Sequence, residues 1–347
     1  MNSSTRTLGV GVVGLGFMGA THVKAYQLAR KDGFPCKLLA VADSNQDRRA
    51  GRPPTAGNLD TGASDDLLFD PAQVRGYETP HQLFADDDIH LVSICTYTDS
   101  HVDLATKALR AGKHVLLEKP VALSAEAILP LLSIASQSGR LCMPAMCMRF
   151  WPGWEWLKDL IAKSTYGALR TARFERLGSG PAWANDFYRN DARSGGAIFD
   201  LHIHDTDFVH WLFGLPASVS SCGSRNHVVT TFRYNSGPAA HALVTAEGGW
   251  SVAPSAGFRM KYLLNFERAT IEFDLSKDPT VTVYHPDRAE PMSFACLGGY
   301  DMEIRHLIDC ITHDRRPRAT LEDALAVTKT IEAELRSIHA GTAMSVG

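Results

Sequence analysis

The sequence predicts an α/β protein in two parts, a doubly wound parallel sheet followed by an α+β part with a mostly antiparallel sheet. Up to about residue 146, short apolar runs alternate with helical patterns, and repeated strand–helix units imply a parallel sheet. Past Trp151 the pattern changes to a series of short alternating stretches, which is typical of antiparallel strands. We therefore expect a first domain over residues 1–123 and a second over residues 124–347.

The expected strands of the first sheet are short apolar runs, at Leu8–Gly14, Lys37–Asp43, Val74–Tyr77, Leu91–Thr96, His114–Glu118 and Leu141–Met146. The helix after the fourth run has clear ends, with Asp99 or Ser100 as its N-cap and Gly112 as its C-cap. The stretch from Ser44 to Asp70 is rich in Gly, Pro and Asp and is too long for an ordinary connection. We interpret this stretch as an inserted surface loop.

The second part contains four expected helices and seven expected strands. The helices are Trp154–Lys163, Phe199–Phe213, Asp301–Thr312 and Leu321–Ile338. The strands are Ala168–Leu177, Ser218–Cys222, Val228–Tyr234, Ala239–Ala246, Arg259–Phe266, Thr270–Phe273 and Thr280–Tyr284.

Composition excludes several functional classes. The 35 lysines and arginines nearly balance 38 aspartates and glutamates, so no nucleic-acid or membrane partner is expected. The seven cysteines are scattered and lack a C-x-x-C pair, which suits reduced thiols in the cytoplasm. Leu8–Ala20 could be mistaken for a secretion signal, but its alternating Val and Gly fit a buried strand that enters a tight turn. We expect a soluble cytoplasmic protein.

A glycine-rich turn follows the first expected strand and opens the first expected helix. In such a turn Gly14 allows the tight bend, Gly16 lets a pyrophosphate approach the backbone, and Gly19 lets the helix pack on the strand. Asp43 ends the next strand, where its carboxylate can accept hydrogen bonds from an adenosine ribose and would repel a 2′-phosphate. We expect NAD to be preferred, with NADP as the alternative if Arg48 and Arg49 reach a 2′-phosphate.

Two further segments contain candidate catalytic groups. The run His114–Pro120 is a strand that ends in Glu118 and Lys119, which places an ammonium at the carboxyl end of a parallel strand, although a solvated Glu–Lys pair is the plainer interpretation. Asp200 and His204 are four residues apart on an expected helix and so share a face.

The two neighbouring histidines, His202 and His210, are interpreted as capping or surface residues. The run Asp200-Leu-His-Ile-His204 is also similar to the D-x-H-x-H metal motif of amidohydrolases. In that family, however, the motif lies near the start of a barrel, whereas here it leads into a helix in mid-chain. We expect no metal, and activity that survives dialysis against a chelator.

Taken in order, these segments resemble the Gfo/Idh/MocA family, which includes glucose-fructose oxidoreductase and inositol dehydrogenase. The resemblance includes G-x-G-x-M-G-x-x-H from Gly14, A-G-K-H-V-x-x-E-K-P up to Pro120, Y-R-N-D from Tyr188, and D-x-x-x-H from Asp200. It implies an N-terminal Rossmann fold and a nicotinamide-dependent dehydrogenase in which Lys119, Asp200 and His204 surround the substrate carbinol. It also implies a cofactor site formed by Gly14, Gly16, Phe17, Met18, Gly19, Asp43, Thr96, His101, Glu118 and Lys119.

The resemblance implies a sugar, cyclitol or related polyol as substrate, and a homodimer or homotetramer. It leaves two alternatives open, an NAD-assisted glycosidase or epimerase and a non-enzymatic NAD(P)-binding sugar sensor. Thr96-Tyr97, Ala197 and Tyr188 depart from the usual family residues at the cofactor and substrate edges. Trp151, Trp154, Trp156 and Trp183 could pack on a sugar ring or in the core, and Arg149, Arg189 and Arg193 could bind polar ligand groups or lie on the surface.

Overall fold

The computed structural model describes residues 7–54, 66–181, 185–294 and 297–346. By packing, the chain forms two compact units, which we call the N-terminal unit (Met1–Cys147 with Gly298–Ala324) and the C-terminal unit (Met148–Leu297 with Leu325–Gly347). This division differs from the one expected at residue 123, because β6 pairs with β5 and α10 packs against α1. No helix in the described ranges is long and apolar enough to cross a membrane.

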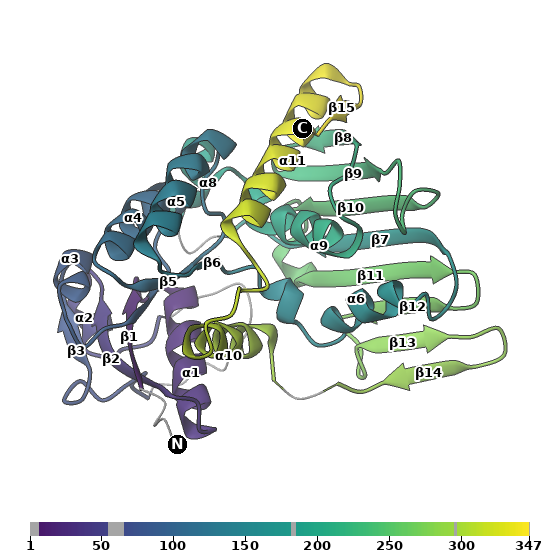
Figure 1. Cartoon of the computed structure of the whole chain (residues 1–347). Helices are drawn as coiled ribbons and strands as arrows, with labels where there is room; N and C mark the ends of the chain where they lie inside the picture. The colour runs from purple at the N-terminus through teal and green to yellow at the C-terminus, as the bar shows by residue number, and fades with distance from the viewer. Residues whose placement is uncertain (1–6, 55–65, 182–184, 295–296, 347) are drawn as a thin grey trace. The chain divides into compact units, whose positions relative to one another are not determined.

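The N-terminal unit is built on a six-stranded, fully parallel sheet in the order β3-β2-β1-β4-β5-β6 (Figure 1). Its strands are β1 (Leu8–Val13), β2 (Cys36–Ala42), β3 (Arg75–Tyr77), β4 (Leu91–Ile94), β5 (His114–Leu117) and β6 (Cys142–Pro144). Each corresponds to one of the six expected strands, so the doubly wound parallel sheet is confirmed. The strand order reverses between β1 and β4, and ligands of such sheets bind at the carboxyl ends of the strands at that point.

The helices of this unit are α1 (Phe17–Lys31), α2 (Gln46–Arg49), α3 (Pro80–Phe84), η1 (Thr98–Ser100), α4 (His101–Arg110), α5 (Ala125–Ser138), α10 (Gly299–Thr312) and the start of α11 (Leu321–Ala340). Ser100 is the N-cap of α4, as the sequence predicts, whereas the C-cap is Ala111 rather than Gly112. Gly112 follows the C-cap with a φ of +75°. The expected surface insertion contains α2, and its residues 55–65 lie outside the described residues.

The C-terminal unit contains a nine-stranded sheet in the order β14-β13-β12-β11-β7-β10-β9-β8-β15 (Figure 1). Its strands are β7 (Leu169–Leu177), β8 (Ser218–Ser224), β9 (His227–Arg233), β10 (Leu243–Gly249), β11 (Arg259–Phe266), β12 (Thr270–Asp274), β13 (Val281–Tyr284), β14 (Ala289–Met292) and β15 (Met344–Ser345). All neighbours are antiparallel except β7 and β10, which confirms a mostly antiparallel sheet.

Three details of this sheet differ from the expectation. β10 begins at Leu243 rather than Ala239, because Gly237 to Ala242 form turns closed by backbone hydrogen bonds. The short edge strands β14 and β15 were not expected, since their residues show no clear alternation of apolar and polar side chains.

The helical segments of the C-terminal unit are η2 (Cys147–Phe150), α6 (Glu155–Ala162), α7 (Asn185–Tyr188), α8 (Asp191–Ser194), η3 (Ile198–His202), α9 (Ile203–Phe213), η4 (Pro254–Ala256) and most of α11. α9 packs against β7, β10 and α6 (Figure 1). Beneath it Trp154 is fully buried, and its ring makes edge contacts with Phe208, Tyr262 and Phe273. Trp154 is therefore a core residue.

Candidate active site

The turn between β1 and α1 has the shape that a dinucleotide phosphate requires. Gly14 has a φ of +84°, and a Cβ at Gly19 would lie 1.8 Å from the carbonyl oxygen of Gly14. At Gly16, by contrast, nothing lies within 4 Å of a Cβ position. Gly16 is also the N-cap of α1 and has no side chain to cap the helix, so the first N–H groups of α1 can bind an anion. Phe17 and Met18 are the first residues of α1 and are partly exposed.

Asp43 follows β2 and lies directly beside the glycine-rich turn. Its Oδ2 accepts a hydrogen bond from the backbone N–H of Leu15 at 2.7 Å, and its Oδ1 accepts one from Asn45 at 2.8 Å. Each carboxylate oxygen keeps a second acceptor site, which suits the two hydroxyls of a ribose. Arg48 approaches Oδ2 to 3.8 Å, whereas Arg49 donates to the carbonyl oxygens of Asp43 and Ser44.

The ends of β4 and β5 contribute the remaining cofactor-site candidates of this unit. The Thr96 hydroxyl lies 2.7 Å from that of Ser100, and Lys119 is partly exposed directly after β5. His101 and Glu118 are buried. The carboxyl ends of β2, β1, β4 and β5 are neighbours in the sheet, so the structure brings these side chains to one edge, together with the glycine-rich turn and Asp43.

The ionisation of Glu118 depends on its neighbours. Burial by itself favours the neutral acid, but the Nε2 atom of His22 lies 3.1 Å from Oε1 and the charges of His22 and Lys119 favour the carboxylate. The effect of His22 and Lys119 outweighs that of burial, so the pKa of Glu118 lies below its usual value. A negative charge therefore lies beside Lys119 at neutral pH.

Asp200 and His204 are partly exposed residues of one helical segment in the C-terminal unit. Asp200 lies in η3, a single turn of π-helix, and His204 lies in the first turn of α9. Every residue from Ser194 to Val209 is buried except these two. An acid and an imidazole are therefore presented together by an otherwise buried segment. Single π-helical turns inside α-helices are frequent at functional sites.

Buried ion pairs hold this segment in place. Asp205 binds the guanidinium of Arg176 through two hydrogen bonds of 3.0 and 3.1 Å, and Asp207 binds Arg149 through two of 2.6 and 3.0 Å. All four side chains are buried. The interpretation of Arg149 as a ligand-binding or surface residue is therefore wrong, because its side chain is buried and pairs with Asp207.

The assignment of His202 as a capping or surface residue is also wrong. Its side chain is 0% exposed, and Nε2 lies 3.3 Å from Oε1 of Glu334, which is itself 0% exposed. Gly248 on β10 makes room for the ring, since a Cβ there would lie 2.7 Å from the Cβ of His202. The pair could not be foreseen, because Glu334 lies 132 residues further along the chain.

The match to protein families agrees with this geometry. Residues 8–146 match the model of an oxidoreductase family with an NAD-binding Rossmann fold, and residues 154–272 match the GFO/IDH/MocA C-terminal domain. The two models together cover well over half of the chain. The chain belongs to the GFO/IDH/MocA family.

Individual GFO/IDH/MocA relatives are distant and match part of their length. An uncharacterized oxidoreductase of Synechocystis sp. (strain ATCC 27184 / PCC 6803 / Kazusa) is 30% identical over 62% of this chain and 53% of its own length. The inositol 2-dehydrogenase of Rhizobium meliloti (strain 1021) is 31% identical over 62% of this chain and 58% of its own. The chain thus spans somewhat more than half the length of these curated relatives.

A solved structure supports the shared GFO/IDH/MocA fold over the full length. Levoglucosan dehydrogenase, in complex with NADH and levoglucosan, superposes with a TM-score of 0.83 over 98% of this chain and 99% of that one, at 19% identity. At this identity the likeness shows the fold.

The remaining candidate site residues lie in different parts of the two units. Lys119 belongs to the N-terminal unit and the Asp200–His204 pair to the C-terminal unit, so their assembly into one site stays a prediction. Arg193 lies over the ring of Phe187, Arg189 is exposed, and Trp183 is outside the described residues. Within the described ranges, no group of three or more His, Cys, Asp or Glu side chains could hold a metal ion.

Proposed function

We propose that this chain is an NAD(P)-dependent dehydrogenase that oxidises a secondary alcohol of a sugar, cyclitol or related polyol. The observation that carries the proposal is the partly exposed Asp200–His204 pair on a segment that is otherwise buried from Ser194 to Val209. A proton-transfer site needs an acid and a base that are held rigidly and can still be reached by the substrate. The ion-paired segment provides this, because it is buried except at Asp200 and His204. The proposal includes NAD as the preferred cofactor, a cytoplasmic location and a homodimer or homotetramer.

The residues of the N-terminal unit fit the cofactor. The N–H groups at the start of α1 would hold the pyrophosphate, which can approach closely at Gly16, and the carboxylate of Asp43 would accept the ribose hydroxyls. The cofactor, when bound, would supply the nicotinamide as acceptor for the hydride of the carbinol carbon. Lys119 follows β5 at the same edge of the sheet, where its ammonium would hydrogen-bond the carbinol oxygen and stabilise negative charge on it.

The C-terminal unit supplies the proton chemistry in this proposal. His204 takes the proton of the alcohol, since an imidazole is the side chain that ordinarily changes protonation near neutral pH. Asp200 lies on the same face as His204, where it orients the imidazole or binds a neighbouring hydroxyl of the substrate. Each oxidation of the alcohol would produce one reduced nicotinamide, so the absorbance of reduced nicotinamide measures turnover.

A substrate screen tests the proposal. The purified chain is incubated with sugars, inositols and sugar acids, each with NAD and with NADP, and nicotinamide absorbance is followed. We expect net reduction with at least one polyol, and a higher kcat/KM with NAD than with NADP. Turnover of a sugar without net cofactor reduction would instead identify a glycosidase or epimerase. Tight NAD binding with no turnover of any compound would identify a sensor, and either result would overturn the proposal.

A further inference from the structure

Lys119 lies between two residues that are each held by a histidine from a different helix. Glu118, which precedes it, contacts His22 of α1, and Pro120, which follows it, contacts His101 of α4. Both histidines are buried, with exposures of 0% and 1%. The short stretch 118–120 is therefore fixed from both sides, while Lys119 itself remains partly exposed.

On the first side, the contact continues from the histidine to the lysine backbone. Nε2 of His22 lies 3.1 Å from Oε1 of Glu118, and Oε2 of the same carboxylate accepts a hydrogen bond from the backbone N–H of Lys119 at 3.1 Å. The other ring nitrogen of His22 lies 3.4 Å from Sγ of Cys95. His22 thus lies within ion-pair distance of the Glu118 carboxylate, and that carboxylate accepts a hydrogen bond from the peptide N–H of Lys119.

On the second side, the ring of His101 bridges two backbone carbonyl groups. Nδ1 lies 2.7 Å from the oxygen of Pro120, and Nε2 lies 3.0 Å from the oxygen of Thr96. A neutral imidazole can donate through only one nitrogen. We assign the proton to Nδ1, because its contact is the shorter and the more deeply buried of the two.

We infer that His22 and His101 are positioning residues for Lys119, and that they act through the backbone of residues 118–120 rather than by contacting the cofactor. The inference rests on the proposed function, in which Lys119 binds the carbinol oxygen. It assigns a role to His22 that the sequence did not suggest. For His101 and Glu118, it replaces direct cofactor contact with control of the lysine beside them.

Two substitutions at His101 separate its two contacts. In His101→Asn the amide nitrogen takes the place of Nδ1 and can still donate to Pro120, whereas in His101→Gln it takes the place of Nε2 and can reach only Thr96. We expect His101→Asn to keep most of the wild-type kcat. We expect His101→Gln to lose kcat by up to about a hundredfold, because small displacements of a catalytic group have effects of that size.

A second pair of variants tests the other side. His22→Gln keeps an amide donor near the position of Nε2, and His22→Leu removes it while retaining an apolar side chain. We expect the leucine variant to lose kcat and the glutamine variant to recover much of it. The matched control is His81→Gln, an exposed histidine on α3, for which kcat should stay unchanged. Thermal unfolding of all variants identifies any that lose the fold.

Two readouts are independent of turnover. The Kd for NADH, measured by its fluorescence, should stay close to the wild-type value in every variant. Peptide mass spectrometry measures the rate at which an amine-directed acylating reagent labels Lys119. This rate should change in His101→Gln and His22→Leu but not in His101→Asn and His22→Gln. A weakened NADH affinity that parallels the loss of kcat would overturn the inference, as would unchanged labelling. Because labelling needs no substrate, it tests the inference even if the proposed dehydrogenase activity fails.

Discussion

At the scale of single residues, accessibility separates the residues that can react from those that hold the structure. Asp200 and His204 are the partly exposed members of a buried stretch, while Asp205 and Asp207 in the same stretch are buried and bound to arginines. Substitution of an exposed group affects stability little, whereas removing one member of a buried ion pair leaves a buried charge. Chemistry and stability should therefore be separable here by mutation.

The first prediction is that His204→Ala and Lys119→Ala each lower kcat by about a hundredfold to ten-thousandfold, the usual cost of losing a positioned acid or base. Both side chains are partly exposed, so thermal unfolding should change little. The Kd for NADH should also be retained. Steady-state kinetics with the substrate found by screening provides the measurement.

The control for this prediction is His210→Ala. His210 lies on the same helix as His204, and its Nε2 is 3.0 Å from the hydroxyl of Thr330. This variant should keep kcat near the wild-type value. If both His204→Ala and Lys119→Ala also stay near wild type, the assignment of the catalytic residues is wrong.

At the scale of elements, the segment η3–α9 depends on partners supplied by three distant parts of the chain. Arg149 comes from η2, Arg176 from β7 and Glu334 from α11. The segment is buried nearly all round, so apolar packing alone does not fix its rotation. Directional ion pairs to three separate elements fix the rotation of the segment. They therefore determine that Asp200 and His204 lie on its partly exposed side.

The second prediction concerns the buried pair of His202 and Glu334. His202→Leu should destabilise the protein by about 3–5 kcal/mol, because Glu334 is then a buried charge without its partner. If His202 were a surface residue, as the sequence suggested, its substitution would leave the free energy of unfolding almost unchanged. Glu334→Leu should destabilise similarly, and the double variant should be much less destabilised than the sum of the two. Denaturant unfolding measures each free energy, and additive effects would show that the pair does not interact.

The same pair should make stability depend on pH. Burial lowers the pKa of His202, but the negative charge of Glu334 outweighs burial, so the pKa is raised above its usual value. A raised histidine pKa stabilises the folded state below the unfolded value of about 6.5, and this contribution is lost as the pH rises through the folded value. The cost of His202→Leu should therefore be larger at about pH 6 than at about pH 9.

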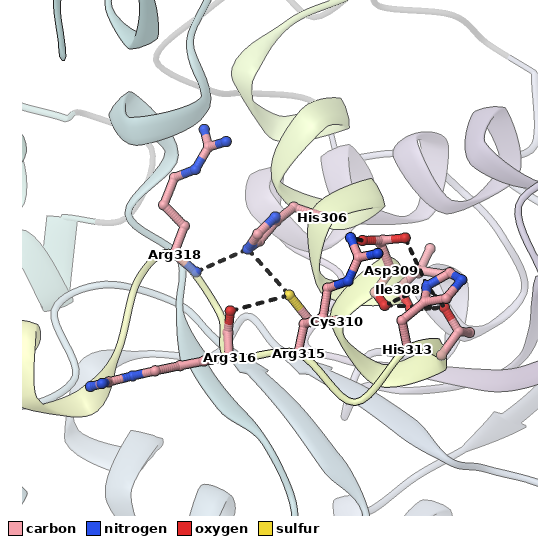
Figure 2. A network of polar contacts seen from close by, with 9 residues as sticks. His306, Ile308, Asp309, Cys310, His313, Arg315, Arg316 and Arg318 are labelled. Carbon is pink, nitrogen blue, oxygen red and sulfur yellow. Dashed lines mark hydrogen bonds and ion pairs between the residues drawn. The ribbon is translucent and has the colours of Figure 1, made fainter. Parts of the chain in front are cut away.

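At the scale of the whole molecule, the two compact units can be followed separately. All six tryptophans lie between residues 151 and 250, within the C-terminal unit. The polar network at the end of α10 lies in the N-terminal unit (Figure 2). There Nε2 of His306 accepts a hydrogen bond from the backbone N–H of Arg318 at 2.9 Å and lies 3.3 Å from Sγ of Cys310.

The third prediction is that His306 sensitises the N-terminal unit to acid. Burial and the nearby charge of Arg318 lower the pKa of His306 to about 4. The neutral ring accepts a hydrogen bond at Nε2 from the backbone N–H of Arg318. A lowered histidine pKa means that the unfolded chain binds more protons as the pH falls from about 6.5. The free energy of unfolding should therefore fall over this range, and less steeply in His306→Gln, whose amide oxygen can still accept from Arg318.

The effect of His306→Gln should be confined to its own unit. Circular dichroism, which reports both units, should show an acid transition moved to lower pH. Tryptophan fluorescence, which reports the C-terminal unit, should change at the same pH as in the wild type. Equal shifts by both probes would mean that the two units unfold as one.

Much of the fold followed from local patterns. The six parallel strands and the glycine-rich turn are each encoded in a few adjacent residues, so periodicity and punctuation identify them. The same is true of Lys119 at a strand end and of the spacing between Asp200 and His204. The short strands β14 and β15 escaped prediction, because an edge strand is stabilised by its neighbour rather than by its own residues.

The sequence by itself determined that this protein pairs a parallel dinucleotide-binding sheet with a second, mostly antiparallel sheet. These features depend on residue order over short distances. Only the tertiary structure decided which charged residues are buried and with what partners. Arg149, His202 and Glu334 look like surface residues in the sequence, because the groups that neutralise them lie between 58 and 132 residues away. Burial and charge pairing depend on contacts that exist only in the folded chain.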